Sequence, residues 1–164
     1  NTADSLYANA TDFFVSSEIV IVENSVIFSS GTNTFSLDLT NGNTNWKQQI
    51  SSISAPIISG ENIFVVTNNG YFAILDKNTG KIISSSNILK ILKSKKQNTK
   101  VKSCIMGSDK IYSTTFNGFL IVSSATSGKP EHFKKIGAPN ISSLVINNGK
   151  LYILTDESKI LVLN

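Results

Sequence analysis

A segment of about forty residues recurs four times along this chain of 164 residues, and the repeat limits the possible folds more than any other feature. The two clearest copies span residues 63–80 and 111–128 and align without gaps at an offset of 48. A copy at 24–42 precedes them at an offset of 38, and a copy at 150–164 follows at an offset of 40. Such a period in units rich in short strands indicates a repeat array, which first of all presents a surface.

Each copy is expected to fold as four short antiparallel strands. In the second copy, the apolar runs 55–59, 62–67 and 71–75 are separated by polar turns, and Asn69-Gly70 favours the positive φ of a tight hairpin. A sheet of four antiparallel strands in each unit is the blade of a β-propeller. Aligned copies form columns that we expect to fill equivalent places between blades; one holds Val26, Phe64, Tyr112 and Tyr152.

The sequence therefore predicts an all-β chain of about four propeller blades, half of a larger or assembled ring. Residues 1–16 are interpreted as an N-terminal segment or a strand of a neighbouring blade, and 17–164 as the propeller region. The extra ten residues between copies two and three place a lysine-rich insertion near 88–100, which could include a short amphipathic helical turn. Because copy four stops at Asn164, its fourth strand is expected to be missing, and because the chain opens with Asn1, we expect a processed or trimmed piece.

The net charge of +4 is concentrated in the insertion and does not favour nucleic acid as a partner. The chain has no arginine, the residue that gives bidentate contacts to phosphate and guanine. Six of the fifteen lysines fall in one segment, namely Lys90, Lys93, Lys95, Lys96, Lys100 and Lys102. They form either a solvated insertion or a docking patch for an acidic partner or an anionic membrane surface. No apolar run approaches the ~20 residues that span a bilayer.

No group of residues in the sequence meets the requirements for catalysis or for a metal site. His132 is the single histidine and is expected to be an exposed polar residue. Asp156-Glu157 falls where a hairpin turn is expected, and the single cysteine, Cys104, lies in an apolar run as a small buried residue. Gly80-Lys81 lacks the earlier glycine of a phosphate-binding loop. We therefore predict no enzyme activity, no cofactor and no metal site.

A spaced signature connects these copies to a known family. In the first copy Leu37-Asp38 is followed by Gly42 and then by Trp46, a pattern that resembles the PQQ-like repeat of quinoprotein-type propellers. The second copy keeps Asp76 and Gly80, and the third keeps Gly128. The resemblance covers most of residues 17–164, and its strength lies in recurrence. It implies structural roles: the aspartate accepts turn amides, the glycine takes a positive φ, and the tryptophan packs between blades.

Two classes of protein carry such repeats, and the chain looks more like the non-catalytic class. Quinoprotein dehydrogenases hold PQQ and a metal at the propeller centre and use a stacked tryptophan, a vicinal disulfide and acidic residues, whereas this chain has one tryptophan and one cysteine. Lipoproteins of the BamB type are scaffolds for β-barrel assembly at the outer membrane. The resemblance thus implies a protein-binding scaffold in the periplasm or at the outer membrane, with other envelope proteins as partners and with possible self-association into a ring. A relative of the dehydrogenases and a ligand-binding sensor domain stay open as alternatives.

Overall fold

The computed structural model describes residues 16–96, 99–136 and 141–163. For residues 94–96 and 142 it describes the backbone only. The described chain forms four antiparallel sheets, three of four strands and one of three. Blade 1 consists of β1 Val20–Val22, β2 Ser25–Ser30, β3 Asn33–Asp38 and β4 Thr44–Gln48. Blade 2 consists of β5 Ile57–Ser59, β6 Asn62–Val66, β7 Tyr71–Asp76 and β8 Ile82–Asn87. Blade 3 consists of β9 Val101–Gly107, β10 Lys110–Thr115, β11 Phe119–Ser124 and β12 Pro130–Lys135. Blade 4 consists of β13 Ile141–Asn147, β14 Lys150–Thr155 and β15 Ile160–Leu163.

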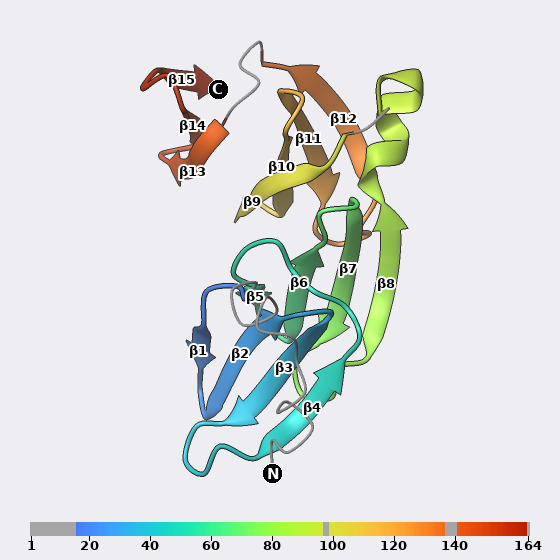
Figure 1. Cartoon of the computed structure of the whole chain (residues 1–164), viewed down its shortest axis with the longest axis vertical. Coiled ribbons are helices and arrows are strands. Elements are labelled where there is room, and N and C mark those ends of the chain that lie inside the picture. Colours follow the sequence, from blue (N-terminus) through green and yellow to red (C-terminus); the bar gives the residue numbers. More distant parts are fainter. Residues whose placement is uncertain (1–15, 97–98, 137–140, 164) are drawn as a thin grey trace.

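The sheets follow one another in sequence order, from the blue blade 1 at the bottom of Figure 1 to the red blade 4 at the top. In each, the strands pair with their sequence neighbours, so the strand order is that of the chain. Blades 1, 2 and 3 share a register shift in the pairing of the third and fourth strands, next to Ser36, Ile74 and Val122. These three residues lie at the repeat offsets of 38 and 48, so the predicted propeller blades are confirmed.

Blade 4 has three strands among the residues that the structure describes, as expected from a sequence that stops at Asn164. Residues 1–15, which include most of the predicted N-terminal segment, lie outside the described part of the chain. Residue Ser16 forms an isolated bridge with Ser30 of β2.

One column of the predicted alignment is wrong by one residue. Phe64, Tyr112 and Tyr152 pair with third-strand residues at equivalent repeat positions. In blade 1 the residue with that pairing is Ile27, opposite Ser36, while Val26 pairs with Leu37. The hairpin between β2 and β3 is one residue shorter than its counterparts, so Val26 points to the opposite face of the sheet.

The hydrophobic core lies in the seams between blades. Blade 2 shows the principle, because its alternate residues face opposite neighbours: Ile63, Val65 and Leu75 cluster with Ile27 of blade 1. Its other face packs on blade 3, and the residues of that seam include Phe64, Val66, Phe72, Ile74, Ile111 and Ile121. The seam of blades 3 and 4 contains Leu120, Val122, Leu151 and Ile153. Inner strands are therefore apolar on both faces, whereas the fourth strands are largely exposed.

The lysine-rich insertion leaves the end of β8 and contains a 3-10 helix, η3, at Ile88–Lys96. In Figure 1 it stands at the outer side of blades 2 and 3, beside β8 and β12. The predicted helical turn is thus present, although in the tighter 3-10 form. No helix in the described ranges is long and apolar enough to cross a bilayer.

Candidate docking surface

Apolar side chains attach the insertion to the seam of blades 2 and 3. Ile88, Leu89 and Leu92 are buried in the cluster that also contains Phe72 and Phe119. The backbone N–H of Ile88 donates to the carbonyl of Gly70 over 2.8 Å, and the N–H of Leu89 donates to Asn87 Oδ1 over 3.1 Å. The insertion is therefore packed onto the blades along one side.

Gly70 provides the seat for Leu89. Its φ of +80° is in the left-handed region, and a Cβ at this position would lie 2.4 Å from Leu89 Cγ. A side chain here would meet both backbone strain and a collision, so glycine is required for the turn and for the approach of the insertion.

The polar side of the insertion carries exposed lysines. Lys90 and Lys93 of η3 and Lys100 behind it are all exposed, and Lys93 has a φ of 50° at the kink of the helix. These three residues are called the insertion surface below. Lys95 and Lys96 also belong to η3, but their side chains lie outside the described part of the structure. The predicted docking role of the six lysines stays a prediction.

Lys102 makes an ion pair and a contact with an aromatic ring. Its Nζ lies 3.5 Å from Asp156 Oδ2 and 5.7 Å from the centre of the Phe116 ring. Because Asp156 follows β14, this pair links blade 3 to blade 4. Lys102 therefore supports a seam as well as contributing positive charge.

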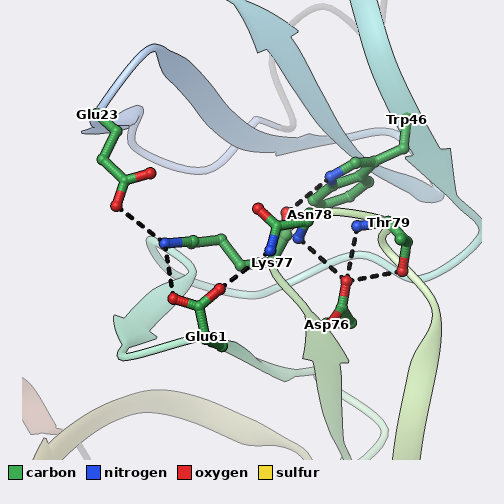
Figure 2. A network of polar contacts seen from close by, with 7 residues as sticks. All are labelled: Glu23, Trp46, Glu61, Asp76, Lys77, Asn78 and Thr79. Carbon is green, nitrogen blue, oxygen red and sulfur yellow. Dashed lines mark hydrogen bonds and ion pairs between the residues drawn. The ribbon is translucent and has the colours of Figure 1, made fainter.

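At the opposite ends of the strands, the signature residues form the seam between blades 1 and 2 (Figure 2). Trp46 of β4 is 8% exposed, and its Nε1–H donates to the carbonyl of Lys77 over 2.9 Å. Gly80, with a φ of +67°, lies beneath the indole ring, and a Cβ there would stand 2.5 Å from Trp46 Cδ2. The tryptophan of one blade therefore packs on the glycine turn of the next.

The turn that carries Gly80 is held by Asp76. Oδ1 of Asp76 accepts the N–H of Asn78 over 3.1 Å, and it accepts both the N–H and the hydroxyl of Thr79 over 2.8 and 2.7 Å. The hydrogen bond from the Thr79 side chain, followed by that from its backbone, lowers the pKa of Asp76 below its ordinary value of 3.8. Asp38 acts likewise in blade 1, accepting the N–H groups of Thr40 and Asn41.

Lys77 adds an ion pair across the same seam. Its Nζ lies 3.0 Å from Glu23 of blade 1 and 3.4 Å from Glu61 of its own blade, as Figure 2 shows. The hydrogen bond to Glu23 is the main cause that raises the pKa of Lys77. No sequence motif predicts these two ion pairs, because Glu23, Glu61 and Lys77 come close only in the folded chain.

The glycine of the signature has a different neighbour in each blade. Gly128 faces Ser84, whose Oγ lies 3.6 Å from a Cβ built on the glycine, so a serine takes the tryptophan position in the second seam. Gly42 has nothing within 4 Å, since no blade precedes blade 1 in the described structure. The predicted structural roles of Asp38, Asp76 and the three glycines thus correspond to visible turn contacts.

His132 occupies the tryptophan position in blade 3 and borders a cavity of about 300 Å³ between blades 3 and 4. Lys134 and Lys150 stand at its edge, and Leu120 and Leu163 line its apolar wall. The sequence did not predict this cavity, because its lining comes from strands of two blades that meet only in the folded chain.

The described residues offer little for catalytic chemistry. No group of three or more His, Cys, Asp or Glu residues that could hold a metal occurs within 16–96, 99–136 and 141–163. Burial raises the pKa of Cys104, although a hydrogen bond with Ser54 opposes this shift, so its thiol is held in the neutral form. Glu157 lies in the β14–β15 turn, as expected, and pairs with Lys159 over 2.8 Å.

Comparisons with known proteins found one matching family and several solved structures of similar fold. The family described as outer membrane protein assembly factor BamB matches residues 9–86. BamB from Moraxella catarrhalis is 16% identical with a TM-score of 0.68, over 95% of this chain and 48% of that one. The designed protein Ika4 is 10% identical with a TM-score of 0.70, over 91% of this chain and 90% of that one. Quinohemoprotein alcohol dehydrogenase from Comamonas testosteroni is 14% identical with a TM-score of 0.61, over 72% of this chain and 20% of that one.

These likenesses concern the fold, and the chain spans about half the length of the BamB structure it matches. A comparison with curated proteins gave no significant match. The family match covers the first two blades, where the Asp38-Gly42-Trp46 signature lies, and the structural match extends over all four. The chain is therefore an array of β-propeller blades that is similar in fold to BamB, and its first half matches the BamB family model.

Proposed function

We propose that this chain is a non-catalytic scaffold that binds other proteins in the bacterial envelope, in the manner expected of a BamB-like propeller. The observation that carries the proposal is the packing of the insertion, which presents Lys90, Lys93 and Lys100 to solvent from a segment anchored by Ile88 and Leu92. The family match to an outer membrane protein assembly factor supports the periplasmic or outer-membrane setting.

The insertion surface fits a partner that is acidic. Its three exposed lysines carry positive charge, whereas the residues 88–100 contain no aspartate or glutamate that could neutralise it. Long-range attraction of this kind speeds association and is weakened by salt. An anchored segment also loses less conformational freedom on binding than a free loop does. We therefore expect the partner to be an envelope protein with an acidic surface segment.

The test is capture of partners from the envelope fraction of the source bacterium, followed by affinity measurement with the purified main partner. The triple variant Lys90→Glu, Lys93→Glu, Lys100→Glu should weaken binding at least about tenfold at low salt, because it turns attraction into repulsion. The matched control is Lys81→Glu, Lys129→Glu, Lys134→Glu, which makes the same charge change at exposed lysines elsewhere.

Equal affinity of the triple variant and its control for that partner would refute the insertion surface as the docking site. Capture of no envelope protein by the unaltered chain would refute the scaffold role itself. Cell fractionation checks the setting separately, since the chain should be found with the periplasmic or outer-membrane fraction.

The fold shared with a quinohemoprotein dehydrogenase makes one further control necessary. We expect no saturable uptake of PQQ in the presence of Ca²⁺ when the chain is titrated and the quinone absorbance is followed. Saturable uptake would favour a quinoprotein role over the scaffold. A different small molecule held stoichiometrically by the purified chain would favour the sensor alternative.

A further inference from the structure

The outward face of blade 4 has the composition and the pattern of a blade–blade seam, but it is open. Ile160 is 66% exposed, whereas the residues at the same repeat position in blades 2 and 3, Phe72 and Leu120, are 0% and 4% exposed. Val162 is 49% exposed, against 4% for both Ile74 and Val122. The difference comes from the neighbour, because each earlier blade is covered by the next one.

The other end of the array has a complementary open face. Val26, Phe28, Phe35 and Leu37 share one face of blade 1, and Ile21 pairs with Val26 on it. Ile21 is 61% exposed and the adjoining Ile19 is 65% exposed. Leu39, in the turn after β3, is 47% exposed, although its counterparts Lys77 and Ala125 are 9% and 6% exposed against the preceding blade.

We propose that these two faces form one more seam of the same kind, between two copies of this chain. In each of the three seams within one chain, the face of one blade that corresponds to the exposed face of blade 4 packs on the next blade. The face that the next blade contributes to the seam is called its leading face here. Among the described residues, the one leading face left uncovered is that of blade 1. A twofold arrangement places blade 4 of each copy on blade 1 of the other, which satisfies both faces at once and closes the ring.

The lengths of the related structures agree with this closure. The chain covers 48% of BamB and 45% of the designed protein Ika8, so two copies supply about the length of either propeller. It covers 90% of Ika4, a chain of similar size with the same fold. Contiguous apolar faces on a soluble protein are also uncommon unless they serve as an interface.

The experiment measures the mass of the purified chain in solution at micromolar concentration by sedimentation or light scattering. The expected mass is twice the 17.7 kDa of one chain. Ile160→Lys with Val162→Lys should raise the dissociation constant roughly 100-fold by placing charge in the seam. Ile19→Asp with Ile21→Asp should do the same from the other face. The control, Ile83→Lys, alters a residue that is 61% exposed on the outer strand β8 and should leave the mass unchanged.

Mixing the two altered chains separates the proposed closure from a general loss of folding. The mixture retains one unaltered seam and places lysines opposite aspartates in the other, so dimers should return although each variant alone is a monomer. Circular dichroism confirms that each variant keeps its β-structure. Three results would each overturn the proposal. The unaltered chain could be a monomer, either double variant could remain a dimer when measured by itself, or the mixture of the two could remain monomeric.

Discussion

At the scale of residues, stability depends on how a few side chains meet across the seams. Trp46 on Gly80 shows the rule, since the glycine is needed both for its φ of +67° and for the space beneath the indole ring. The sequence predicted these two residues as structural, because the signature spacing repeats. The same spacing assigns Ser84 and His132 to the tryptophan position in the next two blades. It could not predict their neighbours, which are Gly128 for Ser84 and a cavity for His132.

Substitution of Gly80 by alanine should lower the free energy of unfolding by about 2–3 kcal/mol, because strain and collision with Trp46 add. Gly42 has a similar φ of +73°, but a Cβ built on it has no atom within 4 Å. Gly42→Ala should therefore lower the free energy of unfolding by only about 1 kcal/mol. Urea unfolding followed by tryptophan fluorescence measures both. Equal losses for the two variants would contradict the seam contact.

The turn of Asp76 predicts a pH dependence. Since hydrogen bonds lower its pKa in the folded chain, its contribution to stability is present above the ordinary carboxyl value of 3.8 and is lost as the pH falls through the lower folded value. Asp76→Asn, which cannot titrate, should therefore be less stable than the unaltered chain at pH 6, and the difference should shrink toward pH 3. Urea midpoints at the two pH values test this, and a difference that widens in acid would show the wrong sign.

At the scale of elements, the alternation of apolar and polar runs was enough to predict the strands and turns of each blade. The failure at Val26 has a local cause, because a hairpin shorter by one residue leaves the sequence pattern intact while it reverses the faces of β2. The break in the period predicts an insertion near 88–100, and the structure has η3 at Ile88–Lys96 in that stretch. Its attachment was not predictable, since Leu89 meets Gly70 only in the folded chain.

Gly70→Ala should destabilise the chain by about 3 kcal/mol and loosen the insertion, since the new Cβ would displace Leu89. Leu89→Ala alone creates a cavity and should cost about 2 kcal/mol or more. In the double variant the collision is relieved, so the loss should be smaller than the sum of the two single losses. Gly31→Ala, with a φ of +57° and nothing within 4 Å, is the matched control. Strict additivity of the first pair would show that the two residues do not touch.

At the scale of the whole molecule, four stacked blades leave two kinds of surface for partners. The outer faces of blades 1 and 4 carry exposed apolar side chains, and we propose that they form a seam between two copies. The insertion surface carries exposed lysines, and we propose that it docks an acidic protein. The period of the sequence predicted the stacking, because each copy needs a neighbour to bury its faces. The period did not predict the chemistry of each surface, because that chemistry depends on side chains that come together only when the blades pack.

The most direct test of the proposed scaffold role is site-specific photocrosslinking in the cells that make the chain. A photoreactive residue at position 93, on the insertion surface, should crosslink to an envelope protein, and the yield should fall when Lys90 and Lys100 are changed to glutamate. The same residue at position 129, in the exposed turn between β11 and β12, should give far less product. Equal crosslinking at the two positions, or none at position 93, would contradict the proposal that this array binds a partner through the insertion.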